Sequence, residues 1–378
     1  AHNLAKQLVG RGHEVRVITN RYPIALPAKE TIDDVRVERL LFLRPQFEQL
    51  RQNRPDLFLA SLYFGPESYR RLRNVFKGFR PDVVNVHFPD RQIPYVLKLR
   101  RQFKFRLVVS LHGHDVERVL NLNGLRNGTR AAALHSLRAI LKEANAVTAV
   151  SRDLLHKAGH VEPEISTKST VINNGIEPAS YEHKESYQHP RPYIFGVGRL
   201  VHKKGFDLLI EAFARVASEA RLDLIIAGSG EERHALDRQV QERNLNGRVH
   251  FFSEASAEEV VKLMNGCVGV VIPSRTESFG IAALEAVAAG KPVLATKTGG
   301  LEEFLIELKT QSRVPEQNGH RQITLVEATV QGIADGMTTM LECRESRVNG
   351  PSGVPEKFTW PHIASRYEQV LLAKADLN

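Results

Sequence analysis

Short apolar runs alternate with amphipathic stretches along most of the chain. The runs are bounded by Gly, Pro or polar residues and read EVRVIT, PDVVNVHFP, RLVVSL, AVTAV, YIFGV, LDLIIA, VHFF, GVVIP and PVLAT. Strands buried on both faces have this composition, and the stretches between them have the length and periodicity of helices. The alternation predicts an α/β protein built from parallel, doubly wound sheets.

The most informative strand-helix-strand unit is SRTESFGIAALEAVAAGKPVLATKTGG, residues 274–300. Its helix is predicted over residues 281–289, which are almost all good helix formers. Ser278 is the predicted N-cap, and Gly290 followed by Pro292 is the predicted stop. The helix therefore begins at the carboxyl end of one buried strand, where open α/β sheets bind their ligands.

Two acids frame this unit, Glu277 at the strand exit and Glu285 in the helix. Eight residues at about 100° each fall about 80° from two full turns, so both carboxylates can face one crevice. The helix start supplies free backbone N–H groups, which favour an anion. These amides belong to Phe279, Gly280, Ile281 and Ala282. Because carboxylates accept hydrogen bonds from diols, amides flanked by acids suit a sugar-phosphate-sugar molecule such as a nucleotide sugar. Alone, the two acids are equally compatible with a surface residue and an ordinary helix.

The same stretch, PSRTESFGIAALEAVAAGKPVLATKTGG, resembles the signature of retaining glycosyltransferases of the GT-B fold, family four of the glycosyltransferase classification. The resemblance implies an α/β protein with two Rossmann-like doubly wound domains facing a central cleft. It implies an acceptor domain at residues 1–175, a donor domain at 176–358 and a helix at 359–378 that crosses back to the first domain. The first strand and its glycine loop are expected to be missing before Ala1, and residues 307–322 are expected to form a loop or mark missing residues.

Other motifs extend the resemblance. HGHD carries His112 of the family's His-Gly element, which approaches the donor sugar, whereas the adjacent His114 and Asp115 are interpreted as structural. GRLVHKKG is similar to the diphosphate-binding element and implies that Arg199 and Lys204 neutralise the leaving diphosphate. The AGSG turn resembles the family's AGxG element, and the resemblance as a whole implies a donor-binding set of Gly228, Gly230, Ser278, Phe279, Gly280, Ile281, Ala282 and Glu285. A lone His, a surface cation or a glycine turn would each be structural more often than functional.

Composition and charge indicate the kind of binding partner. No stretch of the 378 residues approaches the ~20 apolar residues of a membrane span, and Cys267 and Cys343 lack metal-like spacing. Residues 1–170 hold 29 Lys and Arg against 16 Asp and Glu, a balance of +13, whereas the rest balances at −4. Without a nucleic-acid motif, this asymmetry favours an anionic membrane surface or an anionic acceptor. The cationic helix over residues 69–80 fits either a membrane surface or an ordinary helix whose apolar side is in the core.

The predicted activity is retaining transfer of a sugar from a nucleoside diphosphate sugar, with UDP-glucose or a similar UDP-hexose favoured, to a saccharide or lipid-linked acceptor in polysaccharide, glycolipid or cell-envelope synthesis. Arg199, Lys204, Glu277 and His112 form the predicted catalytic set, with Glu277 orienting the transferred sugar and Glu285 holding the ribose. No metal or other cofactor is expected, because two fixed cations can stabilise the leaving group and no Asp-x-Asp pair is present. The expected location is the cytoplasm, with peripheral attachment to the membrane as an option. A sugar-nucleotide epimerase and a non-catalytic nucleotide-sugar-binding module remain alternatives.

Overall fold

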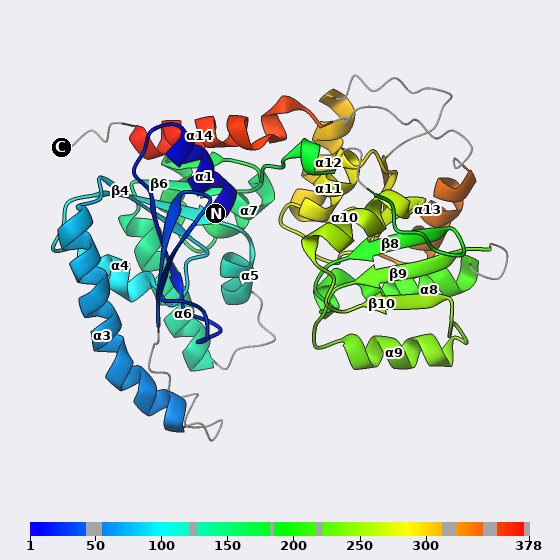
Figure 1. The fold of residues 1–378 in the computed structure, drawn as a ribbon, viewed down its shortest axis with the longest axis horizontal. Helices are drawn as coiled ribbons and strands as arrows, with labels where there is room; N and C mark the ends of the chain where they lie inside the picture. Colours follow the sequence, from blue (N-terminus) through cyan, green and yellow to red (C-terminus); the bar gives the residue numbers. More distant parts are fainter. Residues whose placement is uncertain are drawn as a thin grey trace. The chain divides into compact units, whose positions relative to one another are not determined.

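The computed structural model describes residues 1–42, 55–120, 127–181, 185–216, 221–311, 323–342 and 354–373. The chain divides into two compact units, one formed by Ala1–Ile172 with Trp360–Asn378 and the other by Asn173–Thr359 (Figure 1). These divisions lie within three residues of the boundaries expected from the sequence, and the C-terminal helix belongs to the first unit. Cys343 and residues 312–322 lie outside the described residues.

The first unit contains two sheets. Parallel strands β4 (Val83–His87), β5 (Arg106–Leu111), β6 (Ala146–Ala149) and β7 (Ser169–Val171) pair in that order. In the second sheet, β3 (Val35–Leu40) pairs in parallel with β1 (Arg16–Asn20) and antiparallel with β2 (Lys29–Ile32). The helices are α1 (His2–Gly10), α3 (Pro55–Phe79), α4 (Ile93–Arg100), α5 (His114–Leu120), α6 (Asn127–Glu143), α7 (Arg152–Gly159) and α14 (Trp360–Leu372), with a 3-10 turn η1 (Pro163–Thr167).

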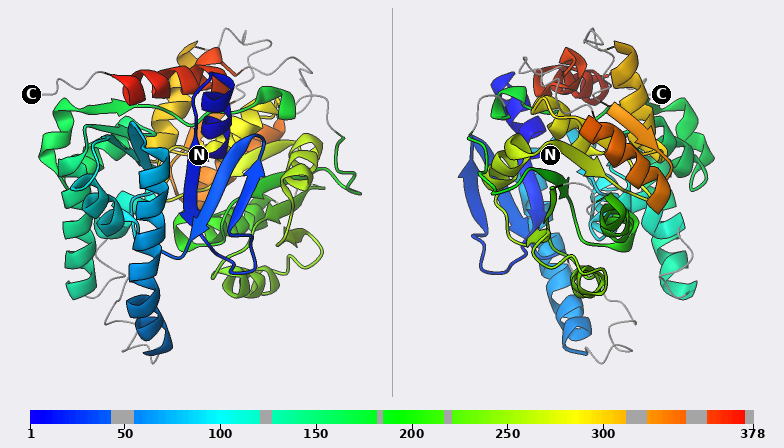
Figure 2. Two further views of the ribbon diagram at one scale, coloured as in Figure 1. Left: turned by 60° about the vertical axis from the view of Figure 1, so that its left-hand side comes forward. Right: turned by 90° about the vertical axis from the view of Figure 1, so that its right-hand side faces the viewer.

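Helix α14 completes the core of the first unit. Its apolar side packs with α1 and with the face of the four-stranded sheet in a cluster of Leu4, Leu8, Val108, Ala146, Ile172, Ile363, Ala364, Tyr367 and Leu371. Arg11 and His13, which follow α1, both bond the Glu368 carboxylate on α14. Figures 1 and 2 show the two helices side by side. Because burying this face removes apolar area from water, the last helix is part of the fold of the first unit.

The cationic stretch at residues 69–80 forms the last turns of α3 and the residue after it. Its apolar side chains lie in a core cluster with Leu40, Phe42, Leu72, Phe76, Tyr95 and Leu99, and Tyr69 packs against that cluster. Arg70 and Arg71 both pair with Glu67. The stretch is therefore an ordinary helix with its apolar side in the core, the alternative that the sequence left open.

The second unit is built on a single six-stranded parallel sheet. Its strand order is β10 (Val249–Phe252), β9 (Asp223–Ala227), β8 (Tyr193–Val197), β11 (Gly269–Ile272), β12 (Val293–Thr296) and β13 (Ile323–Val326). The helices are α8 (Phe206–Val216), α9 (Arg233–Glu242), α10 (Ala257–Gly266), α11 (Ile281–Ala288), α12 (Gly299–Gln311) and α13 (Val330–Glu342), with 3-10 turns η2 (Pro178–Ser180), η3 (His202–Lys204) and η6 (Glu356–Phe358). Helices α8, α9 and α13 share one buried cluster with the strands, and Figure 1 shows α10 and α11 on the other side of the sheet from α8 and α9.

The side of the sheet on which successive strands are added changes between β8 and β11. Strands β9 and β10 extend the sheet from one side of β8, and β11 to β13 extend it from the other. At such a switch point the loops that leave the two central strands diverge to opposite faces and leave room for a ligand at the carboxyl edge. The loops after β8 and β11 carry Arg199, Lys204 and Glu277.

Two local predictions were wrong. Helix α11 is capped by Gly280 in the left-handed conformation (φ 90°, ψ 59°), without a side-chain cap, and Ser278 lies buried two residues earlier. A turn that needs positive φ overrides the capping preference of serine, since glycine adopts it without steric cost. Residues 307–311, expected in a loop, continue α12.

Candidate active site

Backbone contacts hold the loops at the carboxyl edge of the second sheet together. Gly198 N donates to Ala227 O (3.0 Å) and Leu200 N donates to Ser229 O (2.9 Å), joining the loops after β8 and β9. A Cβ atom on Gly228 would lie 1.9 Å from Gly198 O. Gly228, one of the predicted donor-binding residues, therefore has no room for a side chain. The same holds for Gly230, whose Cβ would lie 2.3 Å from Leu200 O.

A bidentate ion pair joins the loop after β11 to the first turn of α8. Arg275 donates through both terminal nitrogens to the Asp207 carboxylate, at 2.7 and 2.6 Å, and donates also to the backbone oxygen of His202 at 2.9 Å. The fork geometry of a guanidinium on a carboxylate fixes orientation as well as distance. This clamp sets the position of the short turn that carries Lys204.

Lys204 and Glu277 meet as a result. The Lys204 ammonium donates to Glu277 Oε2, and the two side chains are 22% and 16% exposed. The stem of Lys204 passes Gly198, where a Cβ would come within 4.0 Å of the lysine Cδ. Two residues predicted from separate motifs, 73 positions apart, therefore form one half-buried ion pair.

The start of α11 offers unused donors beside this pair. Within the described part of the chain, the backbone N–H groups of Phe279, Gly280, Ile281 and Ala282 make no hydrogen bond. Gly280 has no room for a side chain, since a Cβ would lie 2.3 Å from Leu301 Cδ1. The positive end of the helix dipole and these amides together favour a bound anion.

Arg199 is the second cation of this edge. It follows Gly198 in the loop after β8, is exposed, and makes no side-chain hydrogen bond or ion pair to any residue that the structure describes. A guanidinium that is not committed to a protein carboxylate remains available for phosphate oxygens.

Glu285 lies farther along α11 and already has one partner. The Tyr181 hydroxyl, which follows η2, donates to Glu285 Oε1 at 2.9 Å. Burial raises the pKa of the Glu285 carboxyl, and burial followed by the nearby carboxylate raises the pKa of Tyr181. One carboxylate oxygen of Glu285 thus holds Tyr181, and the other remains for a ligand hydroxyl.

His112 belongs to the first unit, directly after β5. Asp115 accepts hydrogen bonds from the backbone N–H groups of His112, Gly113 and Val116, and so stabilises the turn after β5. The His112 ring stacks on Phe88, with ring centroids 4.1 Å apart, and its Nε2 bonds His87 Nδ1 at 2.9 Å. Burial lowers the pKa of His112 to about 4, so the ring is neutral at physiological pH.

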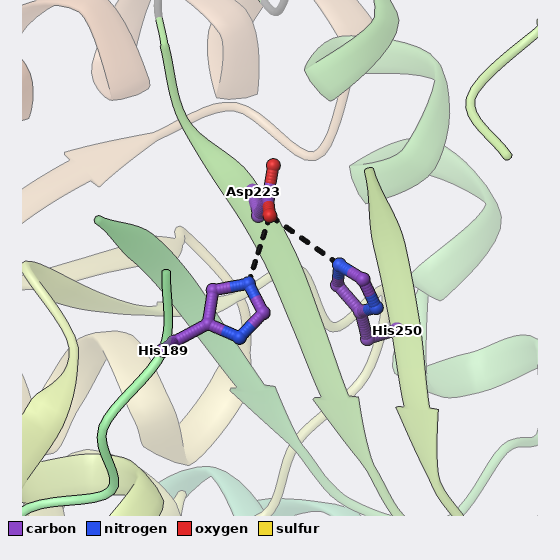
Figure 3. A group of neighbouring side chains, drawn as sticks. All are labelled: His189, Asp223 and His250. Carbon is purple, nitrogen blue, oxygen red and sulfur yellow. Dashed lines mark hydrogen bonds and ion pairs between the residues drawn. The ribbon is translucent and has the colours of Figure 1, made fainter. Parts of the chain in front are cut away.

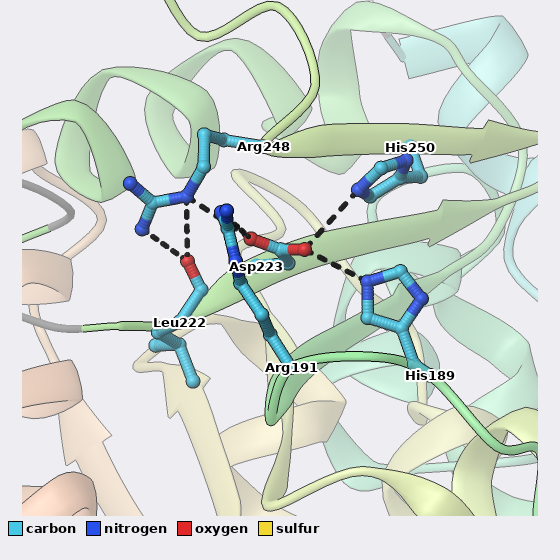
Figure 4. Close-up of polar contacts among 6 residues, drawn as sticks. All are labelled: His189, Arg191, Leu222, Asp223, Arg248 and His250. Carbon is cyan, nitrogen blue, oxygen red and sulfur yellow. Dashed lines mark hydrogen bonds and ion pairs between the residues drawn. The ribbon is translucent and has the colours of Figure 1, made fainter.

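A separate polar cluster lies at the opposite, amino edge of the second sheet (Figure 3). His189 Nε2 and His250 Nε2 lie 2.8 and 3.4 Å from Asp223 Oδ2, and this is the one group with metal-ligand spacing among the described residues. Figure 4 shows two guanidiniums on the same carboxylate, with Arg248 Nε at 3.0 Å and Arg191 at 3.4 Å from Oδ1. Because two fixed cations already outnumber the single carboxylate, a divalent ion would be repelled. The cluster instead ties the segment before β8 to β9 and β10.

Comparisons with known proteins fit this geometry. Residues 1–180 match the family described as Glycosyltransferase Family 4, and residues 180–349 match the family described as Glycosyl transferases group 1. An uncharacterised glycosyltransferase of Methanocaldococcus jannaschii is 31% identical over 379 residues, covering 96% of this chain and 90% of the relative. The chain belongs to glycosyltransferase family 4.

Other similar proteins place this glycosyltransferase in the GT-B class. N-acetyl-alpha-D-glucosaminyl L-malate synthase of Bacillus anthracis is 24% identical, over 97% of this chain and 91% of that protein. The solved structure of sucrose-phosphate synthase from Thermosynechococcus elongatus aligns with a TM-score of 0.75 at 22% identity, over 98% of this chain and 92% of that one. The expected α/β fold of GT-B type is confirmed.

Sequence reasoning missed three features around the predicted residues of the two units. Tyr181 lies in a stretch interpreted as linker, and no local pattern points it toward Glu285. Arg275 stands inside the recognised signature, but its partner is 68 residues away. His87 and Asn85 did leave a signal, since polar residues at alternate positions of an apolar strand, PDVVNVHFP, require buried partners.

Proposed function

We propose that this glycosyltransferase transfers a sugar with retention of anomeric configuration and without a metal ion, from a nucleoside diphosphate sugar to a saccharide or lipid-linked acceptor. The observation that carries the proposal is the Lys204–Glu277 pair in front of the unbonded amides of α11. Such a donor offers phosphate oxygens, which a cation and N–H groups can bind, and sugar hydroxyls, which a carboxylate can bind.

Donor binding exchanges partners within this pair. The diphosphate takes the Lys204 ammonium, the Arg199 guanidinium and the amides of Gly280 and Ile281, while hydroxyls of the transferred sugar take the Glu277 carboxylate. As the bond from the sugar to the diphosphate breaks, negative charge grows on the leaving phosphate, where these fixed donors already point. Retention then follows from attack of the acceptor hydroxyl on the face that the phosphate is leaving, with a phosphate oxygen taking the proton.

Glu285 and Tyr181 are proposed to recognise the ribose. The ribose diol bonds the carboxylate oxygen that Tyr181 leaves open, and the tyrosine fixes the rotamer of the acid. His112 of the first unit is proposed to hydrogen-bond the transferred sugar. A UDP-linked hexose remains the favoured donor, and the synthesis of a polysaccharide, glycolipid or cell-envelope component remains the favoured setting.

The test combines product analysis with a metal control. The full chain is incubated with a panel of UDP- and ADP-hexoses and of saccharide and lipid acceptors, and products are identified by mass spectrometry and by the anomeric proton coupling in NMR. We expect a product with the donor's anomeric configuration, formed equally with and without EDTA. An inverted product or a strict divalent-metal requirement would contradict the proposal. Donor epimerisation without transfer would favour the epimerase instead.

A further inference from the structure

A line of polar side chains crosses the sheet of the first unit beneath α14. Asn85 of β4, Ser110 of β5 and Thr148 of β6 lie on one face, since Ser110 pairs in register with Thr148 and with His87, two residues beyond Asn85. Ser110 and Thr148 are fully buried. Apolar residues would be expected there, because a buried hydroxyl or amide costs free energy unless it is hydrogen-bonded.

These side chains form one continuous hydrogen-bonded chain that ends on His112. Thr148 Oγ1 donates to Ser110 Oγ at 2.9 Å, and Ser110 Oγ donates to Asn85 Oδ1 at 2.9 Å. The Asn85 amide nitrogen lies 3.0 Å from His87 Nε2, and His87 Nδ1 lies 2.9 Å from His112 Nε2.

The chain has a direction, and the direction decides where the protons are. Because the Asn85 oxygen accepts from Ser110, its NH₂ group faces His87 Nε2 and donates to it. A neutral imidazole that accepts at Nε2 carries its hydrogen on Nδ1. His87 therefore donates from Nδ1 to His112 Nε2, and His112 in turn carries its hydrogen on Nδ1.

Both rings stay neutral near pH 7. Burial, together with the neighbouring His112, lowers the pKa of His87 well below its usual 6.5, and burial lowers the pKa of His112 to about 4. The His112 Nδ1 atom has no partner among the described residues and is not one of their two fully buried unpartnered side-chain atoms, so it is at least partly accessible. Phe88 on one ring and His87 at its Nε2 fix the plane in which this N–H points.

We propose that the buried chain from Ser110 through Asn85 and His87 holds His112 in the Nδ1–H tautomer, so that His112 presents a hydrogen-bond donor to an oxygen of the sugar. The proposal rests on the proposed function for its substrate. Asn85 and His87 are then positioning residues, which act only through His112. In this arrangement His112 is no general base, because Nε2 is already bonded and Nδ1 carries the proton.

The tautomer is measured directly in the full chain by ¹⁵N–¹H correlation spectra of labelled histidine. Spectra of His112→Gln and His87→Gln assign the two rings among the 15 histidines. We expect a protonated Nδ1 and an unprotonated Nε2 for both, unchanged between pH 6 and 8. A protonated Nε2 on His112, or a mixture of tautomers, would overturn the proposal.

Asn85→Leu keeps the side-chain size but removes the amide that donates a hydrogen bond to His87 Nε2. Without the amide donor, His112 should shift toward the Nε2–H tautomer that free histidine prefers, and kcat should fall roughly 10- to 100-fold, as when an outer partner of a functional histidine is lost. Thr148→Val is the matched control, since Ser110 can still donate to Asn85. It should lower stability but keep both the tautomer and kcat.

A tautomer unchanged in Asn85→Leu would contradict the proposal, as would a tautomer lost equally in Thr148→Val. His87→Leu removes the donor to His112 directly and gives the same expectation as Asn85→Leu, should that variant not fold. These measurements distinguish a failure of the tautomer proposal from a failure of the proposed function. A parent protein with the expected tautomer but no transferase activity would count against the proposed function, whereas an active protein with Nε2–H on His112 would refute only the tautomer proposal.

Discussion

Lys204 and Glu277 form an ion pair, and in the proposed mechanism donor binding gives each a new partner. Lys204→Ala and Arg199→Ala should each lower kcat by about 10²- to 10³-fold, since each removes a fixed charge from the leaving diphosphate, an effect of about 2.7 to 4 kcal/mol. Initial rates at saturating donor measure the effect. Lys262→Ala, whose partners Glu185 and Glu258 lie on another surface, serves as the control. Full activity in both site variants would place the diphosphate elsewhere.

Replacing each of the two acids of this site should have a different effect on the kinetic constants. In the proposed donor complex Glu285 bonds the ribose, which does not change in the reaction, so Glu285→Gln should mainly raise KM. Glu277 is proposed to bond the reacting sugar and also pairs with Lys204, so Glu277→Gln should mainly lower kcat. Steady-state kinetics over a range of donor concentrations separates the two. The reverse pattern would mean that the donor lies in the opposite orientation.

Long-range ion pairs fix two places in the second unit that local sequence does not predict. The Arg275–Asp207 clamp joins the loop after β11 to the first turn of α8. A double-mutant cycle with Arg275→Ala and Asp207→Ala should give a coupling energy of roughly 1 to 3 kcal/mol in stability, because the pair shares both hydrogen bonds. Each single variant should also lower kcat by moving Lys204. Additive stabilities in chemical denaturation would show that the loops hold each other without the clamp.

Asp223 plays a similar part at the other edge of the sheet. Burial alone would raise its pKa, but hydrogen bonds from His189, Arg248 and His250 outweigh it and hold the pKa of this carboxyl below its usual value. A lowered folded pKa means that the stabilisation is present above the unfolded pKa of about 3.9 and is lost as pH falls through the folded pKa.

Asp223→Asn should therefore reduce the free energy of unfolding by roughly 1 to 3 kcal/mol at pH 7. The difference should shrink as pH falls below about 4, toward the folded pKa. Urea titrations at several pH values test this, with Asp237→Asn as a control, since Asp237 pairs with Arg233 on the surface of α9. A difference that does not depend on pH would contradict an ionic role. Zinc should not stabilise the parent protein, given the guanidiniums on the same carboxylate.

At the scale of the whole molecule, the two halves of the sequence differ in net charge, with +13 over residues 1–170 and −4 over the rest. None of the described helices is long and apolar enough to cross a membrane. The apolar side of the cationic stretch at residues 69–80 is buried, while exposed apolar side chains lie earlier on the same helix, at Leu59, Leu62 and Phe64. Attachment to an anionic membrane would therefore combine the exposed arginines of the stretch with these earlier residues.

Co-sedimentation with anionic vesicles at low and high salt tests this attachment. Arg70→Glu with Arg71→Glu should abolish binding at low salt, and Leu59→Ser with Leu62→Ser should abolish the part that resists salt. Neutral vesicles are the control. Binding that neither pair of changes affects would leave a soluble saccharide as the favoured acceptor.

The α/β architecture follows from the pattern of residues, because short apolar runs predict buried strands and amphipathic stretches predict helices. The sequence also placed Arg199, Lys204 and Glu277 in loops at strand exits and Glu285 within the following helix, where local patterns are sufficient. Local patterns failed at Gly280, because a close contact with Leu301 and a positive φ outweighed the capping preference of Ser278.

Which of these residues meet depends on how the strands and helices are arranged in space. The partners of Lys204, Arg275 and Glu285 lie 68 to 104 positions away in the sequence, and sequence spacing carries no information about such pairs until the strand order is known. The same holds for the proposed tautomer of His112, which depends on side chains from two strands. A tautomer is set by the direction of a hydrogen-bonded chain, and that direction exists only once β4 and β5 are side by side.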